Sequence, residues 1–397
     1  MTLIRGIQAG RAGLLAACAA ILIVVGAAPP ALAQQGGPGA AQGGPQLGGH
    51  GIVVNYPAHG ARKLPYVPAD AYVIADATTG QVLAAKDPHG HLPPASTLKI
   101  LTTDTLMPVL RPGQPVVTSH QAAAVEPSKV GLVQGRSYRV HDLFKALLLI
   151  SANDAAIALA QATGSYRQGV TMMNAEAHHL RAYDTVAKTP NGLPARGQHT
   201  SAYDLALFAR QAITMPEFRT IELMRETSFP LHARHSVTLW NQNLMLGRYP
   251  GDIGGKIGWT TASETTFIGW ARRGGHTLIV TIMHCIPLTE MTYAAKLLTW
   301  GFAMDGRVRP VGVLVPPRAT GHRPAVAHWP ATGHRPAPGQ TAARGAGHRI
   351  AGQARAASSV PAAGLAAGGG LLAAAVAAGG IVLAVRRPRR KGNPPGP

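Results

Sequence analysis

The chain has 397 residues, and 37 Lys and Arg residues against 17 Asp and Glu residues give it a formal charge of +20. All 17 acidic residues lie between Asp70 and Asp305, so residues 50–315 carry a charge of only about +7, while the residues from Arg318 onward contain no acid. This layout indicates a near-ordinary globular domain with a basic tail. Without a zinc-finger spacing or a basic–aromatic strand pattern, it argues against nucleic-acid binding.

Residues 1–33 have the composition of a secretory signal peptide. Arg5 and Arg11 precede an apolar run over residues 12–28, and Ala31-Leu32-Ala33 provides a small-residue cleavage site. An alternative is a lipoprotein cleavage box over residues 15–18, although the apolar core before it would be shorter than the usual ~7–15 residues. We therefore expect cleavage after Ala33 and export of the remainder.

Residues 34–60 are Gly-rich and are expected to form a flexible spacer. Removal of the signal takes Cys18 away and leaves Cys285 as the one remaining cysteine, so we expect neither a disulfide nor a thiolate metal cluster. Cys285 follows a β-rich apolar run over residues 276–284, which favours a buried side chain over a reactive thiol.

Residues 61–310 are expected to form the folded domain. A β-hairpin is predicted over residues 71–85, and a helix is predicted to begin at Ser96, directly after Pro93 and Pro94. The other predicted elements are helices over 141–163, 168–182 and 201–214, strands over 266–271 and 277–284, and a closing helix over 289–304. Strands at both ends predict an α+β fold in which helices flank an antiparallel sheet and the middle of the chain forms an all-helical insertion.

Ser96 and Lys99 form the first candidate catalytic pair. They are three residues apart on the predicted helix, so their side chains share one face. A serine hydroxyl needs a base within hydrogen-bond reach, and lysine can be that base only if burial and neighbouring cations lower its pKa. A helix N-terminus at Ser96 would also direct backbone N–H groups at an oxyanion. Taken alone, Ser-x-x-Lys is a common chance pattern.

Ser151-Ala152-Asn153 ends an apolar run over residues 146–150 and precedes a helix-like stretch. This position predicts a tip between two elements, where Ser151 can relay a proton and Asn153 can hold a substrate amide.

Lys256-Ile257-Gly258 opens a predicted strand that continues into Trp259 and Thr260. A cation beside a glycine suits an edge strand along which an extended peptide lies, with its carboxylate near the lysine. The order Ser-x-x-Lys, Ser-x-Asn, Lys-x-Gly, at separations of 55 and 105 residues, is typical of penicillin-binding proteins and β-lactamases.

The segments after the domain lack a core-forming pattern. Residues 311–361, rich in Pro, Ala, Gly, His and Arg, predict an extended linker that reaches about 3.1 Å per residue. Residues 362–385 end in 21 uncharged residues, enough for a transmembrane helix, although their glycines leave open an Ala/Gly tail. The basic residues 386–397 are expected to be cytoplasmic, which places the domain on the outer face of the membrane.

On these motifs, residues 65–305 resemble the D-alanyl-D-alanine carboxypeptidases, low-molecular-mass penicillin-binding proteins of the serine peptidase type. Residues 191–194 and Asn241-x-Asn243 also look like landmarks of that family. The resemblance implies a β-lactamase/transpeptidase-like fold and removal of the terminal D-Ala from peptidoglycan stem peptides. It also implies that β-lactams are covalent inhibitors and that no metal or organic cofactor is needed.

The resemblance further assigns roles to individual residues. It implies Ser96 as the acylated nucleophile, Lys99 as its base and Ser151 as the proton relay. Asn153 would anchor the substrate amide, and Lys256 would attract the substrate carboxylate. The remaining expected contacts with substrate come from the strand after Lys256, through Gly258, Trp259 and Thr260, with the backbone N–H groups of Ser96 and Trp259 as the oxyanion hole.

Ile257 is a departure from that family, which has threonine at this position. Loss of the hydroxyl would leave a carboxylate oxygen unpaired at a cost of about 1–3 kcal/mol, unless Thr260 or Thr261 compensates. Two alternatives therefore stay open. One is a wall-binding pseudoenzyme that has lost turnover. The other is a β-lactamase, although none of the seven glutamates shows the Glu-x-x-x-Asn pattern of the class A enzymes.

Overall fold

The computed structural model describes residues 41–232 and 235–319. The expected signal peptide, transmembrane helix and basic tail, and most of the expected linker, lie outside the described residues. Within the described ranges, no helix has both the length and the apolar composition needed to cross a bilayer.

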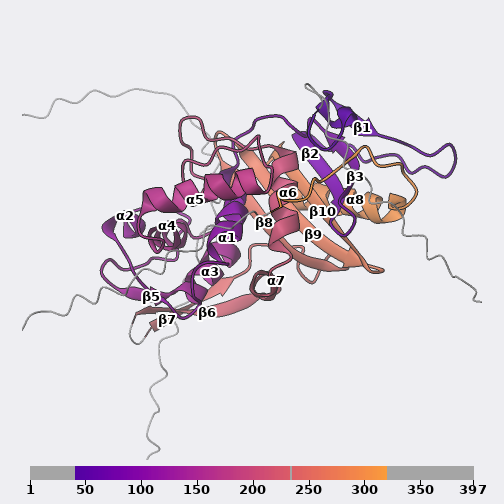
Figure 1. Cartoon of the computed structure of the whole chain (residues 1–397). Coiled ribbons are helices and arrows are strands. Elements are labelled where there is room, and N and C mark those ends of the chain that lie inside the picture. The colour runs from indigo at the N-terminus through magenta and orange to yellow at the C-terminus, as the bar shows by residue number, and fades with distance from the viewer. Residues whose placement is uncertain (1–40, 233–234, 320–397) are drawn as a thin grey trace, which may run out of the picture. The chain divides into compact units, whose positions relative to one another are not determined.

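A seven-stranded antiparallel sheet organises the described chain (Figure 1). Its strands are β1 (Ile52–Val54), β2 (Ala69–Asp76), β3 (Gln81–Lys86), β8 (Asp252–Thr260), β9 (Glu264–Arg273), β10 (His276–Cys285) and β11 (Gly312–Val313). The strand order is β1-β3-β2-β10-β9-β8, and β11 pairs with β3. The indigo and orange strands in Figure 1 lie side by side, so the sheet is assembled from both ends of the domain, as predicted.

The sheet is buried on both faces, because successive strand side chains point into two different cores. One core lies under the helix α8 (Glu290–Met304) and receives Tyr72, Ile74, Phe267 and Val280. The other lies under the helices and receives Val73, Ile268, Trp270 and Ile279. Cys285 is fully buried in the α8 core, as expected from its apolar surroundings.

The middle of the chain supplies the helical side. Its helices are α1 (Lys99–Leu106), α2 (His120–Ala123), α3 (Val140–Leu149), α4 (Asn153–Gln161), α5 (Tyr166–His179), α6 (Ala202–Ala212) and α7 (Pro216–Glu222). Helix α6 packs on β2 and β10, and α1 contacts α4, α5 and α6. Two ribbons complete this side: β4 (Pro115–Val117) with β5 (Ser137–Arg139), and β6 (Glu226–His232) with β7 (His235–Trp240).

The structure differs from the predicted elements in the middle of the chain. The helix expected over 141–163 is two helices, α3 and α4, because Ser151 adopts a left-handed backbone with φ 61°. That conformation is rare for a non-glycine residue and ends α3. The hairpin β6–β7 was not predicted, since most of its residues are exposed or half-buried and give no apolar alternation.

The domain boundaries also differ from the expected 61–310. Strand β1 pairs with β3, and Leu47 is only 1% exposed, so residues expected in the spacer complete one sheet edge. At the other end β11 pairs with β3, and Leu314 is buried. Both of these edge strands are short and lie in Gly- or Pro-rich sequence. Their sequences therefore show no strand pattern that could be recognised locally.

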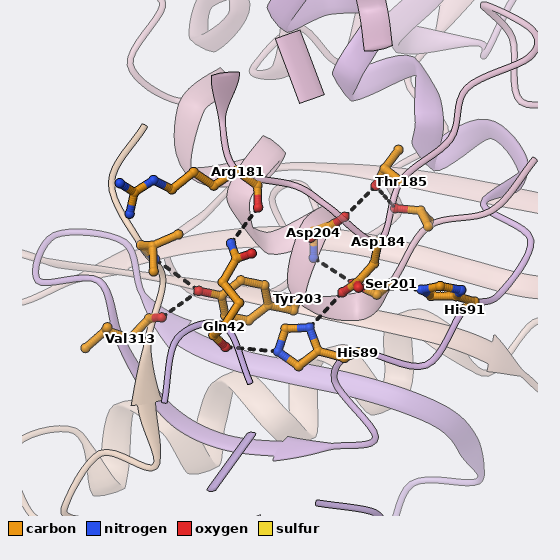
Figure 2. Close-up of polar contacts among 12 residues, drawn as sticks. Gln42, His89, His91, Arg181, Asp184, Thr185, Ser201, Tyr203, Asp204 and Val313 are labelled. Atoms are coloured by element: carbon orange, nitrogen blue, oxygen red, sulfur yellow. Dashed lines mark hydrogen bonds and ion pairs between the residues drawn. The ribbon is translucent and has the colours of Figure 1, made fainter. Parts of the chain in front are cut away.

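A polar network ties both of these edge segments to the helical side (Figure 2). His89 donates to the Gln42 carbonyl through Nε2 (3.0 Å), and its Nδ1 lies 2.7 Å from Asp184 Oδ2. Ser201 donates to the same carboxylate oxygen at 2.9 Å. Burial raises the pKa of Asp184, but these hydrogen bonds outweigh it and hold the pKa below its ordinary value. Tyr203 donates to the Val313 carbonyl at 2.7 Å.

The carboxylate of Asp154, on α4, fixes the loop over residues 130–132. Its carboxylate accepts hydrogen bonds from the backbone N–H groups of Val130 (3.1 Å), Gly131 (2.8 Å) and Leu132 (2.9 Å). Val130 and Leu132 are buried, so no solvent can replace this acceptor. Asp154 therefore holds a loop for which the sequence offers no regular secondary structure.

Replacement of Asp154 by Ala should lower the free energy of unfolding by about 2–6 kcal/mol, because two buried N–H groups lose their acceptor at about 1–3 kcal/mol each. Urea unfolding followed by circular dichroism measures this loss. As a control, Asp142→Ala removes a carboxylate paired with Lys145 at 3.4 Å near the surface, and should cost less than about 1 kcal/mol. Equal losses in the two variants would contradict the role given to Asp154.

Candidate active site

Ser96 lies in a short turn held by its neighbours. The 3₁₀ turn Ala95–Leu98 precedes α1, so the helix predicted to start at Ser96 begins as a tighter turn. Ala95 has φ 47°, and the Pro94 carbonyl accepts from the hydroxyls of Thr97 (2.6 Å) and Thr266 (2.9 Å). These bonds join the turn to strand β9 and fix the direction of the Ser96 side chain.

Lys99 reaches back to Ser96 on the same face. Its Nζ lies 2.7 Å from Ser96 Oγ, 2.8 Å from Asn153 Oδ1 and 2.7 Å from the Asn191 carbonyl oxygen. The lysine side chain is 0% exposed. The structure therefore brings Ser96, Lys99 and Asn153 together as the sequence predicted.

Burial, aided by the positive charge of Lys256, holds the pKa of Lys99 well below its ordinary value, and the Asp154 carboxylate only partly opposes this. Burial also lowers the pKa of Lys256 to about 8, against an opposing attraction from Glu222. Two lysines thus share one desolvated region, where the charge of Lys256 disfavours the charged form of Lys99.

Ser151 lies in the turn between α3 and α4, and Asn153 is the first residue of α4. Ser151 Oγ is buried and has no hydrogen-bond partner among the described residues, and Ser151 lines the same cleft as Ser96. Asn153 donates through Nδ2 to the Glu126 carbonyl at 3.0 Å, which orients its Oδ1 toward Lys99. Because the Ser151 hydroxyl has no partner among the described residues and lines the cleft of the nucleophile, it is available to bond a substrate atom.

Asn191 and Gly192 were not among the candidate site residues, although they belong to a segment noted as a landmark. Thr102 on α1 donates to the Pro190 carbonyl at 2.6 Å and holds this segment against the helix. Gly192 has φ +81°, and a Cβ there would lie 1.8 Å from the Ala95 carbonyl oxygen. A glycine is therefore required for the segment to reach Lys99.

Strand β8 is the edge strand beside Ser96. Gly258 faces Thr266 across the sheet, and a Cβ on it would lie 2.7 Å from the Ser96 backbone nitrogen. Lys256, on the same face, donates through Nζ to the Ile257 carbonyl at 2.7 Å and is 1% exposed. The strand backbone and the nucleophile turn are in direct contact because position 258 has no side chain.

Trp259 and Thr260 end this strand, and both line the cleft. Trp259 is 44% exposed. The hydroxyl of Thr260 lies 2.7 Å from Ser263 Oγ and 3.1 Å from the Ser263 nitrogen, so it closes the turn into β9. Thr260 is therefore part of a turn, whereas Thr261 is exposed at the cleft surface.

Glu222, at the end of α7, and Asp252, the first residue of β8, are buried carboxyl groups that the sequence gave no reason to select. Glu222 Oε2 accepts from the Gly255 nitrogen at 2.9 Å, directly before Lys256. Burial raises the pKa of Glu222 to about 8. Burial likewise raises the pKa of Asp252 to about 7, and its carboxylate accepts from Asn243 at 2.9 Å. Only the fold places Glu222 against the strand that carries Lys256.

The cleft over Ser96 has a volume of about 2430 Å³, well above the roughly 300–1,000 Å³ of a small-molecule pocket. Its lining includes five basic residues, Arg62, Lys63, Lys129, Arg248 and Lys296. It includes two acids, Glu126 and Glu290, and burial raises the pKa of Glu290. The cleft can therefore hold an extended, anionic ligand.

Among the described residues, Asp76, His276 and Asp305 form a group whose ligand atoms all lie within 4.8 Å of one another. None of the three lines the cleft over Ser96. His276 Nδ1 donates to Asp76 Oδ2 at 3.0 Å, and this bond raises the pKa of His276. The geometry matches an ion pair between β10 and the ends of β2 and α8.

Comparison with known proteins supports the same chemistry. Residues 59–286 match the family described as "D-alanyl-D-alanine carboxypeptidase". The chain is 38% identical over 252 residues to D-alanyl-D-alanine carboxypeptidase DacB2 of Mycobacterium tuberculosis, which covers 62% of this chain and 86% of the relative. It is 32% identical over 252 residues to DacD of Escherichia coli, covering 60% of this chain and 64% of that protein.

Solved structures give a consistent result. A crystal structure of a D-alanyl-D-alanine carboxypeptidase from M. tuberculosis superposes with a TM-score of 0.62 at 37% identity, covering 66% of this chain and 99% of that one. Penicillin-binding protein 6B of E. coli superposes with a TM-score of 0.57 at 33% identity, covering 64% and 82%. Together with the family match, these similarities show that the chain belongs to the D-alanyl-D-alanine carboxypeptidase family of serine hydrolases.

Proposed function

We propose that this protein hydrolyses the terminal D-Ala-D-Ala bond of peptidoglycan stem peptides through an acyl-enzyme on Ser96. The observation that carries this proposal is the 2.7 Å contact between Ser96 Oγ and a fully buried Lys99. A pKa well below the ordinary lysine value makes Lys99 available as a base at moderate pH.

The partners of Lys99 explain how it activates the serine. A neutral lysine has two N–H bonds and one lone pair. Asn153 Oδ1 and the Asn191 carbonyl can only accept, so they take both N–H bonds. The lone pair then points at Ser96, whose hydroxyl donates its proton to Nζ as Oγ attacks the substrate carbonyl.

The oxyanion that forms is stabilised by two backbone N–H groups, those of Ser96 and Trp259. Contact between Gly258 and the Ser96 nitrogen supports this arrangement, because it brings the two backbones together. An edge strand such as β8 leaves every second N–H unpaired within the sheet. Donors held rigidly in this way stabilise the transition state without reorganisation.

Ser151 delivers the proton to the departing amine. Its hydroxyl is buried, lines the cleft and has no other partner within the described ranges. D-Ala leaves when the carbon–nitrogen bond breaks, and water then hydrolyses the ester on Ser96. Asn153 serves mainly to orient Lys99 in this mechanism, in addition to its role as an amide anchor.

Substrate binding follows from charge and from the edge strand. An extended stem peptide pairs along β8, and its carboxylates are attracted by Lys256 and by the basic residues around the cleft. We further propose that β-lactams acylate Ser96 and that the enzyme acts on the outer face of the membrane. Support for this location comes from the signal-like N-terminus and the uncharged stretch followed by basic residues near the C-terminus.

Labelling with fluorescent penicillin, combined with a D-Ala release assay on a pentapeptide, tests the activity directly. Wild type should hold a lasting label and release D-Ala, whereas Ser96→Ala should do neither because the ester cannot form. Rapid loss of the label would indicate a β-lactamase instead. Absence of both label and release in the wild type would identify a non-catalytic scaffold.

The pH dependence of penicillin acylation tests Lys99 as the base. The rate should rise with pH as Lys99 loses its proton, within a range below the ordinary lysine pKa. In Lys256→Met a positive neighbour is gone, so the pKa of Lys99 rises and the acidic limb should move to higher pH. Lys145→Met, on α3 and outside the cleft, should leave the limb in place. An acidic limb that stays at the same pH, or moves to lower pH, in Lys256→Met would contradict the assignment of Lys99 as the base.

Gly258→Ala tests the contact between β8 and the nucleophile turn. The new Cβ would lie 2.5 Å from Thr266 Oγ1 and 2.7 Å from the Ser96 nitrogen, which forces the strand away from the turn. Loss of one oxyanion donor lowers acylation about 10²–10³-fold. Gly113→Ala, where nothing lies within 4 Å of the added Cβ, provides the matched control and should acylate normally. Normal acylation in Gly258→Ala would argue against the oxyanion hole described above.

A further inference from the structure

Residues 41–49, which we call the N-terminal strap, lie against the domain away from the cleft over Ser96. Leu47 fixes the strap by burial, since it is only 1% exposed. The Val313 nitrogen, in strand β11, donates to the Gly43 carbonyl at 2.8 Å. The strap therefore joins the first and the last segments of the folded domain, and its attachment decides how firmly both are held.

His89 connects the strap to the helical side, as Figure 2 shows. Its Nδ1 lies 2.7 Å from Asp184 Oδ2, and its Nε2 lies 3.0 Å from the Gln42 carbonyl oxygen. The side chains of His89 and Asp184 are only 20% and 21% exposed, so water competes little for these contacts. One imidazole ring thus bridges the strap and the loop that precedes α6.

Both partners of the His89 ring are hydrogen-bond acceptors. A backbone carbonyl such as that of Gln42 can only accept. Burial raises the pKa of Asp184, but hydrogen bonds from His89 and Ser201 outweigh it and hold the pKa below its ordinary value, so this side chain is a carboxylate. A neutral imidazole has one N–H group and an imidazolium has two. The two contacts are therefore both hydrogen bonds only when His89 carries a positive charge.

Two further histidines lie near Asp184. His91 Nε2 is 3.5 Å from Asp184 Oδ1, the carboxylate oxygen that His89 does not contact. The His91 ring stacks on that of His199 at 4.5 Å, and burial, followed by the charge of His91, lowers the pKa of His199. His91 therefore acts on the other carboxylate oxygen and not on the bond between His89 and the strap.

Helix α6 and a small cavity supply the remaining titratable neighbours. Burial, with the charge of Asp184 added to it, raises the pKa of Asp204 well above its ordinary value. Burial also raises the pKa of Tyr203, whose ring lies 4.7 Å from that of His89, so both α6 groups are neutral. A cavity of about 410 Å³ beside His89 is lined by four more titratable groups, those of His50, Asp70, Lys86 and Asp87. Among the described residues, Asp184 is the carboxylate within hydrogen-bond distance of His89.

We propose that His89 and Asp184 form a pH-sensitive latch, which holds the N-terminal strap while His89 is an imidazolium and releases it when His89 loses a proton. A neutral His89 keeps its one N–H group on the carboxylate, because a charged acceptor forms the stronger hydrogen bond. Nε2 then turns a lone pair toward the Gln42 carbonyl oxygen, and the bond to the strap is lost. The latch is closed on the acidic side of the histidine titration and open on the alkaline side. Since the proposed location of the domain is outside the membrane, the pH of the surroundings would set its state.

Hydrogen exchange followed by mass spectrometry tests the latch in the full chain. The exchange is compared at pH 5.5 and 8.5, on either side of about 6.5, the ordinary pKa of histidine. Peptides that contain Leu47 and Val313 should be about 10- to 100-fold less protected at pH 8.5, after correction for intrinsic exchange, because one hydrogen bond to a charged group is lost. Strand β10, which pairs on both sides, is the internal reference and should keep its protection. Equal protection of the strap at both pH values would overturn the proposal.

His89→Gln tests whether this histidine is the titrating group. A glutamine amide offers N–H groups at one end only, so it cannot donate to both acceptors. Strap protection at pH 5.5 should fall to the level that the wild type shows at pH 8.5, and the pH dependence should disappear. His120→Gln, an exposed change on α2, should respond to pH as the wild type does. A His89→Gln protein that still responds to pH would refute the assignment.

Asp184→Asn separates a latch from a purely structural contact, because the two predict opposite results. With an amide at position 184, neutral His89 can accept from the Asn amide at Nδ1 and donate to the Gln42 carbonyl through Nε2. The strap should therefore stay protected at pH 8.5, where the wild type loosens. Loss of strap protection at both pH values, with β10 still protected, would mean that the carboxylate is needed only for structure and would overturn the latch.

Discussion

Burial of the Lys99 amine between a serine and two oxygen acceptors is the interaction on which the rest of this site depends. A charged ammonium inside a protein costs several kcal/mol of solvation free energy, even after relaxation. Lys256 adds like-charge repulsion nearby, so the neutral amine becomes the favoured form. In the proposed mechanism, the same desolvation that disfavours the charge makes Lys99 a base, and Asn153 and Asn191 direct its lone pair at Ser96.

The second requirement of this site is that neighbouring backbone segments approach the Ser96 turn closely. Gly192 and Gly258 each lie where a Cβ would collide with the turn that carries Ser96, so two chain segments contact this turn through their backbones. Hydrogen bonds hold these segments in place: Thr102 holds the 190–192 segment, Thr266 holds Pro94, and Glu222 holds Gly255 ahead of Lys256. Each uses a neutral hydroxyl or a buried carboxyl group whose partner is a backbone atom, which gives a rigid site without exposed ion pairs.

The cleft is chemically uneven on the two sides of β8. The polar side chains of Ser151 and Asn153 line the cleft on the helical side. Apolar surface and exposed cations lie on the α8 side. This asymmetry follows from the strand itself, because consecutive residues of β8 point into different cores. A substitution at Ile257 therefore changes the α8 side of β8, whereas substitutions at Lys256 or Gly258 change the surroundings of Ser96 and Lys99.

The sequence by itself determined the order of the three motifs, the antiparallel sheet with helices between its strands, and the candidates Ser96, Lys99, Ser151, Asn153 and Lys256. Motif spacing and apolar runs are local properties, so they can be read along the chain. Tertiary structure alone decided that β1 and β11 complete the sheet edge, because the pairing of β11 with β3 and the bridge between Asn55 and Arg309 each join segments more than 200 residues apart. It also decided the contacts of Asn191, whose carbonyl accepts from the Lys99 side chain, and of Glu222 and Asp154, whose carboxylates accept from backbone N–H groups of distant segments. None of these contacts leaves a periodic signal in the sequence. Whether a lysine is a base or a surface charge depends on burial, and burial is set by the packing of the whole domain.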